Sequence, residues 1–139
     1  MKDRYLFPAV FEIGEDGSIG VYFPDLPGCI SAGDNEEEAV LNAKEALALH
    51  LYGMEEDGDD IPAPSSVRDV QADLDPNEYI VMIEVWMPPF RDKMNQRAIK
   101  KTLTIPKWLN DEAEKAGINF SQVLQYALKE KLGIAEKRS

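Results

Sequence analysis

The sequence predicts an α+β fold made of two domains. Short segments in the first part alternate hydrophobic and polar residues with a period of two, which is typical of strands with one buried face. One longer segment spaces its hydrophobic residues by three and four, as an amphipathic helix does. With 44% hydrophobic residues the chain has enough apolar material for a packed core, so we expect it to be folded rather than disordered.

The net charge changes sign along the 139 residues. Residues 1–95 contain six Lys or Arg against 21 Asp or Glu, a net charge of -15, and residues 96–139 contain nine against five, a net charge of +4. These two values add to the overall charge of -11. The overall charge of -11 excludes a uniformly basic nucleic-acid-binding protein. The division of charge predicts two domains with different partners.

Three short strands are expected first. Residues 5–13 alternate so that Tyr5, Phe7, Ala9, Phe11 and Ile13 share one face, and residues 14–17 form a hairpin turn. Residues 19–23 resume the alternation as a second strand. The prolines within residues 24–28 interrupt the ladder because neither can donate a backbone hydrogen bond. Residues 29–32 are then expected to form a short third strand.

A helix and a fourth strand complete the first domain. Asp34 or Asn35 can cap the helix, and the glutamates at 36–38 occupy its first turn, where they stabilise the helix dipole. The helix is expected to end within residues 53–60, and a loop leads to a strand at 79–86. The hydrophobic face of the helix consists of Val40, Ala43, Leu47, Leu51 and Met54.

We predict a first domain of β-β-β-α-β order at residues 1–88, a linker at 89–95 and a second domain at 96–139. The prolines at positions 88 and 89 are expected to end the first domain.

The second domain is predicted to contain a strand, a helix and another helix. Residues 99–105 alternate as a strand, Pro106 favours a first helical turn, and Gly117 ends the helix. Asn119 or Ser121 can cap the next helix. About 40 residues of this kind cannot bury their apolar surface alone, so we expect an intertwined dimer.

This second domain resembles the ribbon-helix-helix DNA-binding family. The resemblance is carried by the strand ending at 102–106, the helix from Lys107, Gly117 and the helix start at 119–121. It implies that two strands pair across a dimer and enter the major groove of DNA.

Strand alternation then directs Lys100, Thr102 and Thr104 outward, as candidates for contacts to base edges. The start of the second helix, at Asn119, Phe120 and Ser121, could bind a phosphate through free backbone amides. The alternative is a dimerisation module without a DNA role, whose lysines form a solvated face.

The first domain resembles the HicB antitoxin family. The matching segments are 23–29, 33–34, 37–39, 42–43 and 45–47. The resemblance implies a partial RNase H-like domain in an antitoxin, which binds the small basic mRNA-cleaving toxin HicA and represses its own operon. A strongly acidic domain suits such a basic partner. We expect a homodimer through the second domain, and a higher oligomer with toxin.

Asp25, Glu36 and Glu37 are the candidate toxin contacts. Glu36 and Glu37 are also explained as charges that stabilise the helix dipole, and the prolines beside Asp25 shape the backbone of their turn.

Enzymatic activity is not expected. The single Cys29 and single His50 provide neither a disulfide nor a zinc cluster, and we expect no catalytic residues, metal site or cofactor. We also expect a cytoplasmic protein, without a signal sequence or membrane helix. Two alternatives remain: a metal-dependent nuclease of RNase H type using Glu12 and Glu84, and a stand-alone repressor that senses a small ligand.

Overall fold

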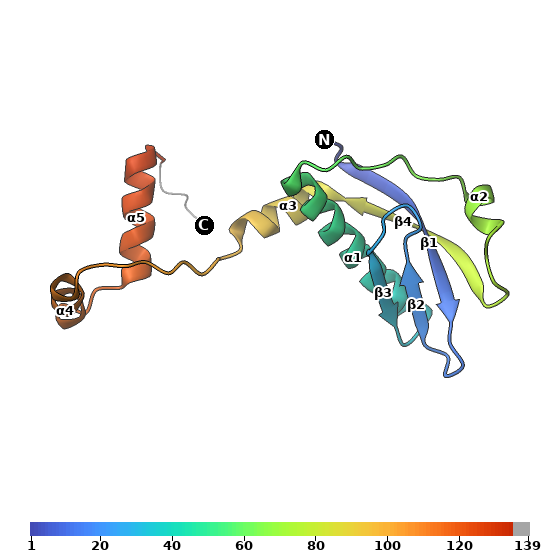
Figure 1. The fold of residues 1–139 in the computed structure, drawn as a ribbon, viewed down its shortest axis with the longest axis horizontal. Coiled ribbons are helices and arrows are strands. Elements are labelled where there is room, and N and C mark those ends of the chain that lie inside the picture. The colour runs from blue at the N-terminus through green and yellow to red at the C-terminus, as the bar shows by residue number, and fades with distance from the viewer. Residues whose placement is uncertain (135–139) are drawn as a thin grey trace. The chain divides into compact units, whose positions relative to one another are not determined.

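A computed structural model describes residues 1–134 of the chain (Figure 1). The chain divides into two compact units, Met1–Ala98 and Ile99–Ser139. The first unit combines a four-stranded antiparallel sheet with three helices, and the described part of the second, residues 99–134, contains two helices. The predicted α+β class is confirmed.

The sheet of the first unit has the order β3-β2-β1-β4. Neighbouring strands in this order are all antiparallel. β1 pairs with β4 over nearly its whole length, but with β2 only from Val10 to Ile13. The strands are β1 (Arg4–Ile13), β2 (Ile19–Tyr22), β3 (Ile30–Gly33) and β4 (Glu78–Trp86).

The long helix α1 (Glu36–Asp57) covers one face of the sheet (Figure 1). Of the residues predicted to face inward on the first strand, Tyr5, Phe7, Ala9 and Phe11 are buried against it, whereas Ile13 is 45% exposed at the end of β1. On β4, Ile83 and Val85 are buried, and Tyr79 and Val81 are partly buried. On the helix, Ala39, Ala43, Leu47, Ala48 and Leu51 are buried, while Val40 and Met54 pack at the edge of the core. This burial follows the helical period read from the sequence.

Asn35 is the N-cap of α1, because its side chain accepts a hydrogen bond from the Glu38 N–H at 2.9 Å. The helix continues past Gly53 and ends at Asp57, within the predicted range of 53–60. Gly58, with a φ of 71°, then closes the helix in the left-handed conformation.

A short helix, α2 (Val67–Gln71), lies in a segment that was expected to be a loop. The Ser66 side chain caps it by accepting from the Asp69 N–H at 3.2 Å. The helix contacts β4 and buries Val70. Pro8 and Val10 are also buried, although their side chains point away from α1. The second face of the sheet is therefore partly covered.

The predicted linker at 89–95 is wrong, because these residues belong to the helix α3 (Met87–Gln96). Pro88 and Pro89 lie in the first turn, where no backbone N–H is required, so they begin the helix instead of interrupting the chain. Phe90 packs edge-on against Tyr52 of α1, with ring centroids 6.0 Å apart. The first unit therefore extends to Ala98 rather than ending at residue 88.

The second unit contains α4 (Lys107–Lys115) and α5 (Phe120–Leu132). Residues 99–105 are extended but form no strand. A strand needs a hydrogen-bonded neighbour, and residues 1–134 of one chain offer none to this segment. No side chain between Ile99 and Ile134 is buried.

Candidate nucleic-acid and protein interfaces

The extended segment before α4 displays the residues expected to contact DNA. Lys100, Thr102 and Thr104 are all exposed and alternate with Leu103 and Ile105, which are 54% and 41% exposed. In an extended chain, alternate side chains lie on one side about 7 Å apart. The two hydrophobic residues are only partly covered within the described part of the chain.

The start of α5 brings the other three candidate residues together. Asn119 is the N-cap, and its Oδ1 accepts from the Gln122 N–H at 3.1 Å. The next two residues, Phe120 and Ser121, begin the helix, where backbone N–H groups point out of the helix end. Ser121 Oγ accepts from Gln125 Nε2 at 3.1 Å and keeps its own proton to donate. The side-chain oxygen of Asn119 therefore caps the helix, and its side-chain NH2 group can still donate a hydrogen bond.

The turn between the two helices sets the direction in which α5 begins. Gly117 has a φ of 69°, which a residue with a side chain rarely adopts. Its N–H donates to the Glu114 carbonyl at 3.0 Å, and the Ile118 N–H donates to the Ala113 carbonyl at 3.1 Å. These two bonds form a Schellman motif, which ends α4 and places Asn119 at the start of α5.

In the first unit, Glu36 and Glu37 lie in the first turn of α1 and are exposed. Glu36 Oε1 accepts a hydrogen bond from the Tyr79 hydroxyl at 3.1 Å. Burial and this neighbouring carboxylate raise the pKa of Tyr79. Glu37 has no ion-pair partner among the described residues and is open to a cation from outside.

Asp25 is engaged within the protein itself. Its carboxylate accepts from the Ser65 N–H at 2.9 Å and from Ser65 Oγ at 2.5 Å. These bonds hold the segment before α2 against the turn between β2 and β3. The structure therefore gives Asp25 a positioning role that no local pattern indicated, because its partner is 40 residues away in the chain.

Asp25 also lines an acidic hollow of about 670 Å³ beside the second half of α1. The run of acids after α1 contributes to this hollow, although the sequence predicted only a solvated loop there. Because α1 has 22 residues and rises 1.5 Å per residue, the hollow lies well away from Glu36 and Glu37. The polar and apolar residues that define it are Asp25, Leu49, His50, Asp57, Asp59 and Asp60.

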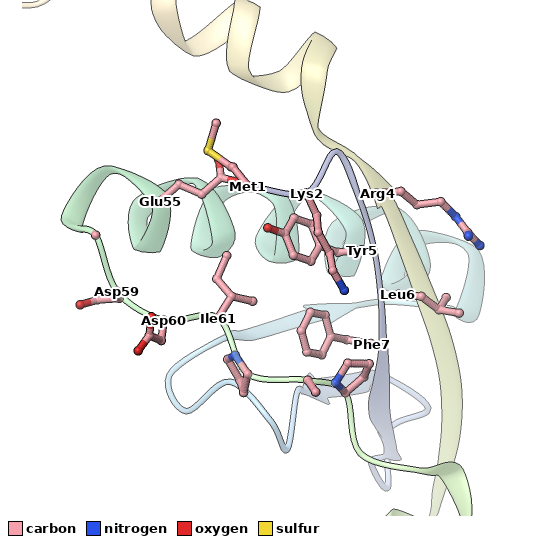
Figure 2. Close-up of a pocket in the computed structure, with 14 residues that line it drawn as sticks. Met1, Lys2, Arg4, Tyr5, Leu6, Phe7, Glu55, Asp59, Asp60 and Ile61 are labelled. Atoms are coloured by element: carbon pink, nitrogen blue, oxygen red, sulfur yellow. The ribbon is translucent and has the colours of Figure 1, made fainter.

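A second cavity, of about 630 Å³, lies beside the first half of β1 (Figure 2). It exists because β2 does not pair with this part of β1, and the segment after α1 runs there instead. Figure 2 shows Tyr5 and Phe7 facing Ile61, while Asp59 and Asp60 point away from them. Lys2 adds a positive charge. The sequence carried no signal for this cavity, since its walls come from distant segments.

The carboxylates considered for a nuclease do not form a cluster. Glu12 lies near the end of β1, opposite Glu78 of β4. Glu84 lies opposite Leu6, which precedes Glu12 by six residues on β1. Six residues of strand correspond to about 20 Å. Glu84 is instead bound to Arg4, with 2.6 Å between Oε2 and Nη2, and this bond lowers the pKa of Glu84.

Within the described residues, no three Asp, Glu, His or Cys side chains come together as a metal site. None of the helices in that part of the chain has the length and hydrophobicity to cross a membrane.

A solved structure identifies the class of protein to which this fold belongs. The chain is similar to a chain of a toxin–antitoxin complex from Streptococcus pneumoniae, with a TM-score of 0.57 and 28% identity. The match covers 92% of this chain and 99% of the other. The fold is thus one found in bacterial toxin–antitoxin systems.

The family follows from the sequence comparison. The model of the HicB-like antitoxins of bacterial toxin-antitoxin systems matches residues 7–127, and the chain belongs to this family. The family is one of antitoxins, which are regulatory proteins.

Two relatives show how far the sequence similarity extends. An uncharacterised 14.9 kDa protein of Haemophilus phage HP1 is 40% identical over 78 residues, 56% of this chain and 58% of that protein. Antitoxin HicB 2 of Photorhabdus laumondii is 38% identical over 66 residues, 48% of this chain and 47% of that protein. The chain thus spans about half the length of the curated relatives it matches.

Proposed function

We propose that this protein neutralises a HicA-type mRNA-cleaving toxin with its first unit and represses its own operon with its second. The observation that carries the proposal is the charge of the two units. Met1–Ala98 contains seven Lys or Arg against 21 Asp or Glu, a net charge of -14, whereas residues 99–139 contain eight against five, +3. Together these give -11. Opposite signs suit two partners of opposite charge.

The toxin-binding half of the proposal rests on the acidic first unit and on membership of the antitoxin family. A basic RNA-cleaving partner would be attracted to this unit and would be blocked from binding RNA. Two acidic regions are available on the surface. They are the start of α1, with Glu36 and Glu37, and the hollow lined by Asp59 and Asp60 near its end.

The DNA-binding half rests on the second unit, whose hydrophobic residues lack cover in a single chain. Leu103, Trp108, Leu128 and Leu132 are between 51% and 69% exposed. A second copy would cover these residues and would pair the two extended segments antiparallel as a ribbon. In that homodimer Lys100, Thr102 and Thr104 form the base-reading face, and the α5 N-terminus at residues 119–121 binds phosphate.

Operator binding is tested by Lys100→Ala in the full-length protein. Loss of a base contact costs about 1–3 kcal/mol, so we expect roughly 5- to 150-fold weaker binding to the operator in a gel-shift titration. Lys131→Ala, which removes the same charge from the last turn of α5, is the matched control. Equal affinities for the wild type and Lys100→Ala would overturn the assignment of this residue.

Neutralisation is tested by co-expression with a HicA-type toxin. Two double variants, Glu36→Lys/Glu37→Lys and Asp59→Lys/Asp60→Lys, separate the two acidic regions. The variant of the region that binds toxin should lose protection of growth while it still binds the operator. Glu15→Lys/Asp73→Lys makes the same change in net charge elsewhere. Failure of the wild type to protect would overturn the toxin-binding half.

A further inference from the structure

The cavity beside the first half of β1 has one wall of unpaired backbone. The Ile13 N–H donates to the Asn77 carbonyl at 3.0 Å, so the odd-numbered residues of β1 bond to β4. By alternation, the even-numbered residues direct their N–H groups to the opposite side, where β2 pairs only from Val10 onward. Leu6 is an even-numbered residue that lines the cavity. Its N–H therefore points toward the cavity.

The segment that runs past this part of β1 does not pair with it. Residues 61–64 line the cavity, but Pro62 and Pro64 have no backbone N–H to donate. Among residues 1–134, the Leu6 N–H has no hydrogen-bond partner. The cavity thus contains a backbone donor that is available to a bound molecule.

The hydroxyl of Tyr5 is a second donor. Tyr5 lines the cavity and is only 8% exposed, and its hydroxyl makes no hydrogen bond to the described residues. A tyrosine buried to this extent usually has a partner for its hydroxyl. No side-chain oxygen in this part of the chain is fully enclosed without a partner, so the Tyr5 hydroxyl is open to the cavity.

The rest of the cavity offers a flat apolar surface. The rings of Tyr5 and Phe7 are nearly parallel, with 18° between their planes and 6.3 Å between their centroids. They face Ile61 across the cavity (Figure 2). A planar hydrophobic group can lie against these rings, and a volume of about 630 Å³ is in the range of small-molecule sites.

The charged residues of the lining favour an anion. Lys2 has no ion-pair partner among the described residues. Arg4 and Glu55 are already held in ion pairs with residues outside the lining. Asp59 and Asp60 point away from the cavity (Figure 2). The Lys2 ammonium is therefore the charge available to a molecule bound there.

We propose that this cavity binds a small aromatic carboxylate. The aromatic ring lies against Tyr5 and Phe7, and the carboxylate accepts hydrogen bonds from the donors of the lining. These donors are the Leu6 N–H, the Tyr5 hydroxyl and the Lys2 ammonium. Three donors, one of them charged, favour a carboxylate over an amine. The binding needs neither toxin nor DNA, so it can be tested separately from the proposed function.

The first test titrates cinnamate into the full-length protein and follows the backbone amides by NMR. We expect a Kd of about 1 mM or below for a probe of this size, with saturable shifts at Leu6 and Ile61. The amides of Ser31 and Ala32, on β3, should not shift. Cinnamamide, which has the same ring but no charge, should bind about tenfold more weakly.

Two results of this titration would overturn the proposal. One is the absence of saturable shifts at Leu6 and Ile61 up to about 10 mM cinnamate, tenfold above the expected Kd. The other is equal affinity for cinnamate and cinnamamide, because the donors would then not select a carboxylate.

The second test uses Tyr5→Phe, which removes the hydroxyl and keeps the ring. This variant should bind cinnamate about tenfold more weakly. Its urea denaturation should match that of the wild type, because the hydroxyl has no partner in the described protein. Lys2→Gln should weaken binding about threefold.

Tyr22→Phe is the matched control, because it removes a hydroxyl that donates to Glu78 at 3.2 Å, outside the cavity. This variant should bind cinnamate as the wild type does. Wild-type affinity in both Tyr5→Phe and Lys2→Gln would overturn the assignment of the site.

Discussion

The thiol of Cys29 is buried beside α1, where its Sγ lies 3.7 Å from the Ala46 carbonyl oxygen. Burial raises the pKa of Cys29 from its ordinary value of 9.0 to about 11. The nucleophile in thiol chemistry is the thiolate, so this cysteine is suited to packing rather than to reaction. Its chemistry at neutral pH is that of a small hydrophobic residue.

We predict that native Cys29 reacts with iodoacetamide at pH 8 about a hundredfold more slowly than the unfolded chain, because the thiolate fraction falls tenfold per pKa unit. Stability should also fall as the pH rises from 9 to 11. In that interval the unfolded thiol ionises while the folded one keeps its proton, and below 9 both are neutral. Urea unfolding of Cys29→Ala, which lacks this dependence, is the comparison.

Gly33 lies where β3 leads into α1, and its environment excludes a side chain. A Cβ atom at this position would lie 2.8 Å from the Cα of Ala39 on the helix. That neighbour is backbone and cannot move aside without shifting α1. The close approach of strand and helix at this point therefore depends on glycine.

We predict that Gly33→Ala lowers the free energy of unfolding by about 1–3 kcal/mol, measured by urea denaturation. Gly20→Ala is the matched control on β2, because nothing lies within 4 Å of the added Cβ. Its effect should stay within about 0.5 kcal/mol. Similar losses in the two variants would contradict the explanation by close approach.

At the scale of elements, α3 is joined to the rest of the first unit by Arg91. Its guanidinium binds Glu55 of α1 through two bonds, of 3.0 and 2.7 Å, and Asp3 at 2.7 Å. It also donates to the Lys2 carbonyl. The Glu55 side chain is 6% exposed and that of Arg91 15%. The hydrogen bonds to Glu55 are the main cause that raises the pKa of Arg91.

We predict that Arg91→Met costs about 3 kcal/mol of folding free energy, because it leaves the Glu55 carboxylate buried without a partner. The double variant Arg91→Met/Glu55→Met should recover much of this loss, since it removes both charges. Chemical denaturation of the two variants and the wild type gives the comparison.

Arg4→Met provides the control for a pair on the surface. Arg4 and Glu84 are 60% and 50% exposed, so the loss should stay below about 1 kcal/mol. An equal effect of Arg4→Met and Arg91→Met would show that burial of the pair does not determine its contribution.

At the scale of the whole molecule, the two units are stabilised in different ways. All of the buried side chains described in residues 1–134 belong to the first unit, which has its own core. The helices of the second unit bury no side chain. If a second copy covers the second unit, its stability depends on protein concentration, and that of the first unit does not.

We predict two unfolding transitions in the full-length chain. The free energy of unfolding of the second unit should rise by about 1.4 kcal/mol for each tenfold increase in protein concentration, and its unfolding midpoint should rise with it. The unfolding midpoint of the first unit should stay constant. The units carry one tryptophan each, Trp86 and Trp108, so Trp108→Phe and Trp86→Phe isolate the two fluorescence signals. A concentration-independent transition from Trp108 would contradict a dimeric second unit.

Much of the first unit could be predicted because its strands and α1 follow local rules. The strand period of two predicted that Phe7 and Val21 face the core, and the helical period predicted the same for Leu47. All three side chains are buried. The Asn35 cap was predicted as one of two neighbouring residues. The candidate DNA-binding residues are exposed, but Leu103 and Ile105 between them are exposed as well, so the strand alternation and the DNA contacts remain predictions.

The failures share one physical cause, which is that a distant partner decided the outcome. The prolines before α3 indicated a break, but contacts with distant residues, among them Glu55 and Tyr52, hold that segment as a packed helix. The bond between Asp25 and Ser65 likewise joins distant segments, while a toxin contact of Asp25 stays a prediction. No local pattern encodes either contact.

The α+β class, the core faces of the main elements and the opposite charges of the two parts can be read from the sequence, because periodicity and composition are local properties. The strand order, which leaves β4 at an edge, the extension of the first unit to Ala98 and the cavities beside β1 and α1 emerge only when the chain is folded. These features depend on which distant segments meet when the chain buries its apolar surface.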